Sequence, residues 1–431
     1  MITSKEQIIN YFNSGIKSTK NFKIGIEHEK FLFNNKDNKR IDYSKIKEMF
    51  NALLEFGWNP ILEEENIIGL NKKGKNITLE PGNQIELSGE KLNNIHEACA
   101  ESQDYLFELR QVTKKLGINI VSAGFDPISK LNEIPNNPKQ RYELMTKDMP
   151  LGGELSLDMM YRTCGTQINI DYNSEKDFAK KFRIVNSIVP ITIALFANSS
   201  IVEKKNSNYL SYRSKVWQNT SRGGLPKVFF EELNFEKYAD FIINFPILFI
   251  QDGSRYISGK KYVFKDFMNG KIDEIENKFP NENDLSIHLS TIFTENRLKK
   301  YIEMRSMDTC GWDCLCAGPA FNIGILYGNI DEVFDLVSKW DKDKIINAYL
   351  EAPKKGFNTQ LMGKDLLFWA STLLNLSRKG LESRDILNKS GKNETLFLNH
   401  LQKVIDNKTT NADHMISKFS KNEDLNELYD K

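Results

Sequence analysis

The stretch FKIGIEHEKFLF, residues 22–33, places two carboxylates inside a segment that otherwise has the pattern of a buried β-strand. Alternate side chains of a strand share a face, so Glu27 and Glu29 lie on one face, about two residue rises of ~3.3 Å apart. Repulsion and desolvation both disfavour such a pair. The strand therefore predicts that a cation or water compensates the two charges.

Three further segments show the same alternation of apolar side chains with acids or amides. An antiparallel sheet with one wet face explains any single strand of this kind. Solvated faces usually mix Lys, Thr and Ser with acids, whereas these faces carry Glu, Gln, Asn and one Arg, so the four strands together favour a lined cavity. The polar positions are Glu80 and Glu86 on either side of a Pro-Gly break, Gln167 and Asn169 in GTQINIDYN, and Glu303 and Arg305 in KKYIEMRSMD.

Five glutamates that converge on one cavity require hard cations, and oxygen-rich ligation suits Mg²⁺ and Mn²⁺. Carboxylate-held Mg²⁺ beside an arginine is the usual equipment for phosphoryl transfer. The segment GLNKKGKN, residues 69–76, imitates the spacing of a P-loop, but Asn follows its lysine and no helical pattern begins there. We interpret this segment as a hairpin turn.

Helix boundaries are indicated by capping residues. The spacing Thr3-x-x-Glu6 predicts a capping box at the start of a first helix, and Ser174-x-x-Asp177 predicts another helix start. A long helix is expected from about residue 91 to Gly117.

Composition narrows the class of protein. The net charge of +1 over 431 residues gives no hint of a polyanionic partner, so nucleic acid is not favoured. The most apolar stretch, residues 188–197, is about half the roughly 20 residues that a membrane helix needs, and we expect a cytosolic protein without a membrane partner. With no linker or repeat, we expect one domain over residues 1–431, sheet-rich and catalytic from about 20 to 325 and mostly helical from about 330 to 431.

The cysteines favour a reduced protein. Five residues, an odd number, are too few for a disulfide scaffold. The run CGWDCLC lacks a second Cys/His pair at zinc-finger spacing, so we expect free or partly buried thiols in preference to structural zinc. The five are Cys99, Cys164, Cys310, Cys314 and Cys316.

The motifs resemble the plant and proteobacterial type of glutamate–cysteine ligase, and they follow that family's order from about residue 22 to 325. The resemblance implies an α+β fold like that of glutamine synthetase, in which a curved, mainly antiparallel sheet forms a funnel-shaped active site with helices packed outside. It also implies ATP-dependent joining of the γ-carboxylate of L-glutamate to the amine of L-cysteine through a γ-glutamyl phosphate. The stretches that carry it are GIEHEKF, ITLEPGNQIELSG, RYELMTKDMPLGG, LDMMYRTCGTQINIDYNSEKDFAKKFRI, LFANSS, LSYRSKVWQNT, FPILFI and RLKKYIEMRSMD.

The same resemblance assigns roles to the polar strand residues. Arg305 would steady the transferring phosphoryl group, and Gln167 and Asn169 would contact a metal, glutamate or phosphate. Two or three Mg²⁺ ions, with Mn²⁺ as a possible substitute, would be held by Glu27, Glu29, Glu80, Glu86 and Glu303.

Other candidates have a structural alternative. Arg162, Arg213 and Arg297 are candidates for carboxylate or phosphate contacts because the arginine fork suits both, and a surface ion pair is the alternative. Trp217 is a candidate wall of the substrate pocket or else a core residue. His28 is expected to pack on the opposite face of its strand, hydrogen-bonded, and His288 is left between a structural and a substrate-proximal place.

Two alternative functions remain at this stage. One is a ligase of the same superfamily that uses a different acceptor amine, because the acceptor pocket has no readable motif. The other is a nucleotide- or metal-binding homologue without catalysis, which the complete set of clustered acids disfavours. The partners expected are ATP, L-glutamate and L-cysteine, and the protein is expected to be a monomer or a homodimer.

Overall fold

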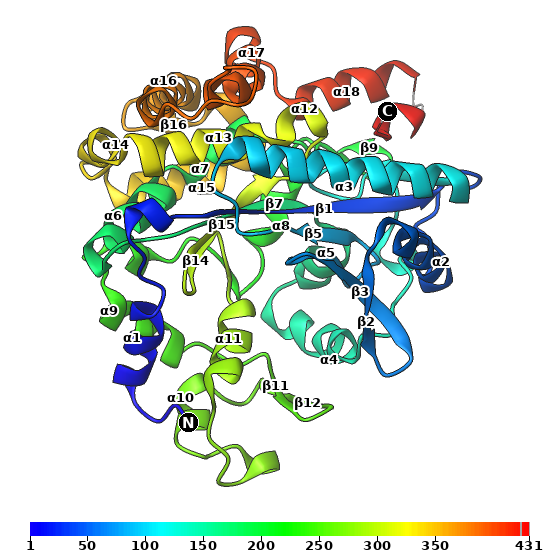
Figure 1. Cartoon of the computed structure of the whole chain (residues 1–431), viewed down its shortest axis with the longest axis vertical. Helices are drawn as coiled ribbons and strands as arrows, with labels where there is room; N and C mark the ends of the chain where they lie inside the picture. The colour runs from blue at the N-terminus through cyan, green and yellow to red at the C-terminus, as the bar shows by residue number, and fades with distance from the viewer. Residues whose placement is uncertain (423–424, 431) are drawn as a thin grey trace.

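One large antiparallel sheet organises the chain (Figure 1). The computed structural model describes residues 1–422 and 425–430. The strands follow the order β14-β15-β7-β1-β5-β4-β3-β2, and β6 pairs with the end of β1. These strands are β1 (Ile24–Asn34), β2 (Asn59–Glu63), β3 (Asn66–Lys72), β4 (Lys75–Leu79), β5 (Ile85–Ser88), β6 (Ile118–Val121), β7 (Gly165–Ile170), β14 (Asn296–Leu298) and β15 (Ile302–Asp308).

The four segments with acids or amides on one face all form strands of this sheet, and they are neighbours within it. They occur in β1, at the β4 to β5 connection, in β7 and in β15, in the spatial order β15-β7-β1-β5-β4. The P-loop imitation forms the hairpin between β3 and β4, where Lys73 and Gly74 both have positive φ angles. The interpretation of that segment as a turn is confirmed.

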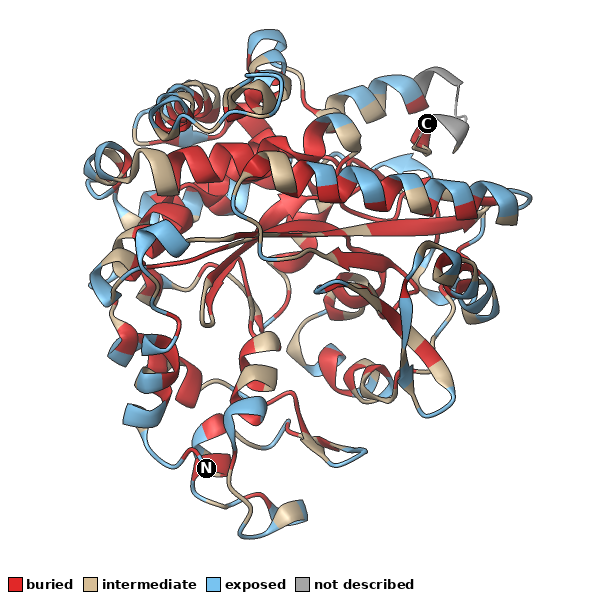
Figure 2. Cartoon of the chain, viewed as in Figure 1, coloured by how far each residue is buried: buried red, intermediate tan, exposed pale blue. Residues whose placement is uncertain are grey.

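The two faces of the sheet have different surroundings: one packs against helices, and the other is polar. Ile168, Ile302 and Met304 point away from the polar face and join the largest apolar cluster. Helices cover this side of the sheet in Figure 1, and Figure 2 shows that the buried residues concentrate there. The helices up to residue 217 are α1 (Lys5–Asn13), α2 (Tyr43–Leu53), α3 (Ile95–Leu116), α4 (Gln140–Asp148), α5 (Ser156–Arg162), α6 (Glu175–Ser187), α7 (Val189–Leu195) and α8 (Tyr212–Trp217).

The described part of the chain beyond Ile330 is mostly helical, with short loops and one short strand pair. Its apolar residues join the same cluster as the sheet, so that Leu373 and Ile168 belong to one core. No helix in the described ranges combines the length and the apolar character needed to cross a membrane. The later helices are α9 (Phe235–Ile243), α10 (Phe264–Met268), α11 (Glu282–Ser290), α12 (Trp312–Leu315), α13 (Ala317–Ile323), α14 (Ile330–Val337), α15 (Lys342–Lys355), α16 (Leu366–Arg384), α17 (Asn399–Asn407) and α18 (Asn411–Asn422).

Short strand pairs lie outside the main sheet. Of these, the hairpin of β11 and β12 borders the site described below. The pairs are β8 (Ile201–Val202) with β9 (Lys205–Asn206), β10 (Gly223–Gly224) with β13 (Phe293–Thr294), β11 (Phe249–Asp252) with β12 (Arg255–Ser258), and β16 (Gln360–Leu361) with β17 (Lys364–Asp365).

Helix caps agree with the sequence in part. Ser174 caps α6 and accepts from the main-chain N–H of Asp177 at 3.1 Å, as predicted. The long helix α3 ends at Gly117 as expected but begins at Ile95, because Asn94 caps it. The first helix has its capping box one residue later than predicted, with Ser4 and Gln7 in place of Thr3 and Glu6.

The expectation of free thiols is wrong for four of the five cysteines. Cys99 on α3 is bonded to Cys316, which caps α13, and Cys310 is bonded to Cys314 in the turn after β15. Only Cys164 keeps a buried thiol. Cys99 and Cys316 are 217 residues apart and meet because α3 and α13 lie on the same side of the sheet, which spacing alone does not reveal.

Candidate active site

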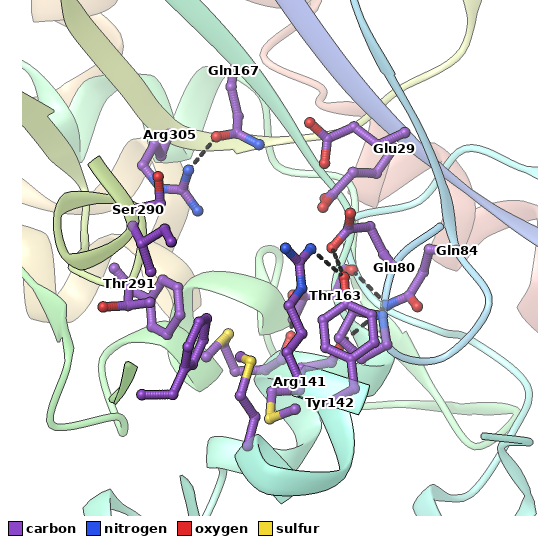
Figure 3. Close-up of a pocket in the computed structure, with 18 of the residues that line it drawn as sticks. Glu29, Glu80, Gln84, Arg141, Tyr142, Thr163, Gln167, Ser290, Thr291 and Arg305 are labelled. Carbon is purple, nitrogen blue, oxygen red and sulfur yellow. Dashed lines mark hydrogen bonds between the residues drawn. The ribbon is translucent and has the colours of Figure 1, made fainter. Parts of the chain in front are cut away.

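A cavity of about 320 Å³ opens on the polar face of the sheet. Its wall combines strand residues with side chains from α4, α5, α8, α11 and the β11–β12 hairpin. In Figure 3, Arg305 and Gln167 lie across the space from Glu29 and Glu80, and Arg141 and Tyr142 lie opposite Gln167. Parts of the chain that are far apart in sequence therefore face one space.

Four predicted glutamates form one wall of this cavity: Glu27, Glu29, Glu80 and Glu86. Glu29 of β1 stands directly opposite Glu86 of β5 in the antiparallel register, so the two side chains share a face. Glu27 stands opposite Gln167 of β7, and its carboxylate accepts from Asn169 Nδ2 at 2.6 Å. The convergence that the sequence predicted for these residues is present.

The acidic wall crowds carboxyl groups in a place that disfavours their ionisation. Burial raises the pKa of Glu29 to about 7, and the Glu80 carboxylate adds to this effect. Burial also raises the pKa of Glu86 well above its ordinary value, with further contributions from Glu27 and Glu80. The main-chain N–H of Gly165 donates to Glu29 and offsets only part of this cost. Such a wall attracts cations.

A cationic wall faces the acids. The buried Glu303 carboxylate gathers the guanidinium groups of Arg297, at 2.7 Å, and Arg305, at 2.5 Å, and the Lys299 ammonium, at 3.1 Å. Burial opposes ionisation of Glu303, yet these three cations hold its pKa well below the ordinary value. Arg305 also donates to Gln167 Oε1. The net positive charge of this group suits phosphate or carboxylate oxygens.

Glu303 differs from the other four predicted metal ligands because it lies behind the cavity wall. Its Oε1 accepts from Arg305, while its Oε2, although near Lys299, accepts no hydrogen bond from the described residues. Asn169 Oδ1 is likewise buried without a partner in the described chain. The described residues contain no group of three or more His, Cys, Asp or Glu side chains already arranged around one metal position.

Sequence reasoning missed a third wall that helices supply. Arg141 of α4 donates to Tyr142 Oη at 3.0 Å, and Tyr142 Oη donates to Glu80 Oε2 at 3.1 Å. Among the described side chains no carboxylate forms a salt bridge with Arg141. Met145, Met159 and Met160 line the cavity beside this pair. The motif RYELM contained Arg141 and Tyr142, but no periodicity in the sequence marked them as site residues.

Two predicted arginines do not reach the cavity wall. Arg162 pairs with Asp158 at 2.9 Å and with Glu203 at 3.3 Å, so the predicted substrate contact is replaced by an internal ion pair. Arg213 is buried beneath the wall, and its guanidinium donates to the carbonyl of Arg305 at 2.8 Å. Neither a direct substrate contact nor a surface ion pair describes Arg213.

The other candidates fall into two groups. Arg297 and Trp217 line the cavity, and the guanidinium groups of Arg213 and Arg305 lie 5.0 and 5.3 Å from the Trp217 ring centre. His28 lies on the opposite face as expected, but neither ring nitrogen has a hydrogen-bond partner among the described residues. His288 is structural, since it is buried, contacts the Ile242 carbonyl at 2.9 Å and stacks on Phe264.

Comparison with known proteins identifies the family of the chain. The family model described as glutamate-cysteine ligase family 2 matches residues 23–431. The glutamate–cysteine ligase, chloroplastic, of Nicotiana tabacum is 40% identical over 422 residues, 96% of this chain and 80% of the relative. The Arabidopsis thaliana protein of the same name is 37% identical over 423 residues, 97% of this chain and 80% of the relative.

A solved structure supports the fold. The glutamate–cysteine ligase of Francisella tularensis in complex with AMP superposes with a TM-score of 0.54 at 14% identity, over 94% of this chain and 86% of that chain. The expected α+β fold with a large, mainly antiparallel sheet and helices packed outside is confirmed.

The expected compartment is contradicted. The plant relatives are named chloroplastic, so the expectation of a cytosolic protein is wrong. Net charge and hydropathy do not differ systematically between folded enzymes of these two compartments, and they therefore carried no information on this point. The chain belongs to glutamate–cysteine ligase family 2, and its activity is the ATP-dependent formation of γ-glutamylcysteine, the first step of glutathione synthesis.

Proposed function

We propose that the two facing walls of the cavity divide the ligation between them. The acidic wall takes the cations that accompany the ATP triphosphate, and the cationic wall takes the phosphoryl group and the reacting carboxylate. The observation that carries this proposal is the separation of charge, with Glu27, Glu29, Glu80 and Glu86 on one side of the cavity and Arg297 and Arg305 on the other.

The donor set fits two or three Mg²⁺ ions, with Mn²⁺ as a substitute. All four side chains of the acidic wall offer carboxylate oxygens, the ligands that hard cations prefer. Asn169 Oδ1 adds a buried oxygen without a hydrogen-bond partner among the described residues. The carboxylate of Glu303 would join this set only by leaving its ion pairs with Arg297, Lys299 and Arg305. When bound, Mg²⁺ supplies neutralisation of the charge that otherwise keeps a carboxylate away from a phosphate.

Protein side chains position the reacting groups in both steps of the ligation. An oxygen of the glutamate γ-carboxylate attacks the γ-phosphorus of ATP and releases ADP, and the acceptor amine then attacks the acyl carbon and releases phosphate. Arg305, held by Gln167 and Glu303, steadies the phosphoryl oxygens through both steps. Arg297, which lines the cavity beside Arg305, offsets the charge of the γ-carboxylate.

The third wall favours L-cysteine as the acceptor amine. Arg141, with no acid partner among the described residues, suits the α-carboxylate of an amino acid. Met145, Met159 and Met160 beside it offer a small apolar surface with polarisable sulfur, which suits a thiol better than a hydroxyl. L-2-aminobutyrate, of similar size, is the acceptor that most closely tests this preference.

Phosphate release from ATP is the direct assay. With Mg²⁺ and glutamate present, we expect cysteine to stimulate release, and we expect chelation of the metal to remove it. Arg305→Ala should abolish turnover while ATP still binds, because the guanidinium acts on the phosphoryl group and not on the base.

Lys300→Ala is the matched control, since Lys300 forms an exposed ion pair with Glu282 next to the same strand. If cysteine does not stimulate phosphate release at any physiological concentration, the proposal is contradicted. Stronger stimulation by another amine would replace cysteine as the acceptor while leaving the roles of the two walls in place.

A further inference from the structure

The main chain of Arg305 is held from beneath the cavity. Its N–H donates to the Glu295 carbonyl at 2.9 Å, and its carbonyl accepts from the Arg213 guanidinium at 2.8 Å. Glu295, the residue just before β14, therefore stands opposite Arg305, one step beyond the Asn296 and Met304 pair. Any movement of Glu295 or Arg213 is transmitted directly to the backbone that carries Arg305.

The Glu295 side chain is buried and has one hydrogen-bond partner in the described chain. Glu295 and Tyr349 are 2% and 3% exposed, and Tyr349 Oη donates to Glu295 Oε1 at 2.8 Å. Tyr349 belongs to α15, in the helical part of the chain that contributes no residue to the cavity wall. A helix outside the sheet is thus connected to Arg305 through one intermediate residue, Glu295.

The charges around Glu295 show what its carboxylate does. Burial raises its pKa, while the cations Arg213 on α8 and Arg305 on β15 favour the charged form. Asp308, at the end of β15, is the other acid facing this group. Asp308 already accepts hydrogen bonds from three groups that lie elsewhere, the Asn198 N–H and the hydroxyls of Ser199 and Ser211.

Glu295 is accordingly the buried acid whose orientation depends on a single hydroxyl. Without the Tyr349 hydroxyl, the carboxylate loses its fixed place beside the two arginines. Arg213 then loses part of the field that aims its guanidinium at the Arg305 carbonyl.

We propose that Tyr349 and Glu295 are positioning residues for Arg305, which act by fixing Arg213 and the main chain of β15. The proposal rests on the phosphoryl-contacting role of Arg305 given above. Tyr349 and Glu295 do not line the cavity, and they set the direction of the Arg305 guanidinium toward Gln167 and the cavity.

Tyr349→Phe removes the hydroxyl and keeps the ring. We expect kcat to fall about tenfold, because small misplacements of a positioned group have effects of this size or larger. The KM for cysteine should stay unchanged, since Arg141 and the methionines are untouched. Tyr43→Phe is the matched control: it removes one hydroxyl hydrogen bond, to the Ile67 carbonyl at 3.2 Å, on α2, which contributes nothing to the cavity wall.

Two further measurements separate positioning from stability. Glu295→Gln keeps an acceptor for Tyr349 but removes the charge, and it should lower kcat similarly, whereas Glu295→Gln combined with Tyr349→Phe should be no worse than the more affected single variant. In Tyr349→Phe the acidic limb of the kcat profile should move to higher pH, because the lost hydrogen bond stabilised the carboxylate, and this movement should vanish in the Glu295→Gln background.

The outcomes are distinguishable. Wild-type kcat in soluble, folded Tyr349→Phe and Glu295→Gln overturns the positioning role, as does a loss in Tyr349→Phe that the Tyr43→Phe control shares. Losses that add fully in the double variant also overturn it. If the wild-type protein itself fails to release phosphate with glutamate and cysteine, the proposed function has failed and these variants are not its cause.

Discussion

At the scale of single residues, the acidic wall is a group of side chains whose charges oppose folding. Glu86 is buried, faces Glu29 across a strand pair and is also near Glu27 and Glu80. Like charges placed together in a desolvated site disfavour the folded state, and functional sites commonly lower the stability of a protein in this way. The residues that suit metal-bound nucleotide are therefore those that destabilise the protein in its absence.

Glu86→Gln should increase stability without metal and decrease activity. Glutamine removes a buried carboxyl whose pKa burial holds well above the ordinary value, and at pH 7 this is expected to raise the free energy of unfolding by about 1–2 kcal/mol in chelator. Addition of Mg²⁺ and ATP should raise the melting temperature of the wild type and have a smaller effect on the variant.

Glu65→Gln, at an exposed position in the turn between β2 and β3, is the matched control. Equal melting temperatures for Glu86→Gln and wild type in chelator, together with an equal response to Mg²⁺ and ATP, would argue against the charge-repulsion account.

At the scale of elements, the long helix α3 is anchored by a residue from the other end of the chain. The main-chain N–H of Ile95, in the first turn of α3, donates to Glu394 Oε1 at 2.7 Å. Arg384 at the end of α16 contacts Glu394 Oε2 at 3.2 Å. A carboxylate at a helix N-terminus satisfies an unpaired N–H group and complements the helix dipole.

Glu394→Gln should lower the free energy of unfolding by about 1–2 kcal/mol, since it removes the charge from both a helix terminus and a buried ion pair. The KM values for ATP and glutamate should stay at the wild-type level. Denaturant titration measures the stability, and Glu382→Gln, exposed on the same helix as Arg384, provides the comparison. A change in KM without a change in stability would contradict an anchoring role.

Elements also show which parts of the fold the sequence could predict. Alternation fixed the face of Glu27, Glu29, Gln167 and Arg305 because side-chain direction in a strand has a period of two. The order of the strands did not follow from alternation, and the resemblance implied only a curved, mainly antiparallel sheet without a strand order. The position of α4, and with it Arg141, depends on tertiary packing that no local period encodes.

Arg162 shows that the direction of a side chain at the end of a helix is hard to predict from sequence. It ends α5 and points to Asp158, whereas the next residue, Thr163, lines the cavity. A shift of one residue at the end of a helix rotates a side chain by about 100°, and element ends are the least certain feature of a sequence. The chemistry of an arginine is readable in the sequence, but the direction of its side chain at such an end is not.

At the scale of the whole molecule, two helices on one side of the sheet that are far apart in sequence are tied together covalently. The Cys99–Cys316 bond links α3 to α13 across a sequence separation of 217 residues, whereas the two cysteines of the Cys310–Cys314 bond are separated by only 4. A cross-link restricts the unfolded chain more strongly when it closes a longer loop.

Cys99→Ser should therefore lower the free energy of unfolding by about 5 kcal/mol in the absence of reductant, against about 2 kcal/mol for Cys314→Ser. With excess reductant, each variant and the wild type should converge in stability. Equilibrium denaturation with and without dithiothreitol measures both effects. A larger loss for Cys314→Ser than for Cys99→Ser would exclude loop closure as the source of the stabilisation.

The two faces of the central sheet share one set of strands, and this limits how the protein can diversify. Inserting or deleting one residue in β1, β5, β7 or β15 would turn the acids toward the helices and the isoleucines toward the cavity. The acidic and amide side chains on the strands are thus inherited with the hydrophobic core as a single unit. The walls from α4, α5 and the β11–β12 hairpin lie outside the sheet, so a lineage can change its acceptor by altering them without rebuilding the machinery that activates the carboxylate.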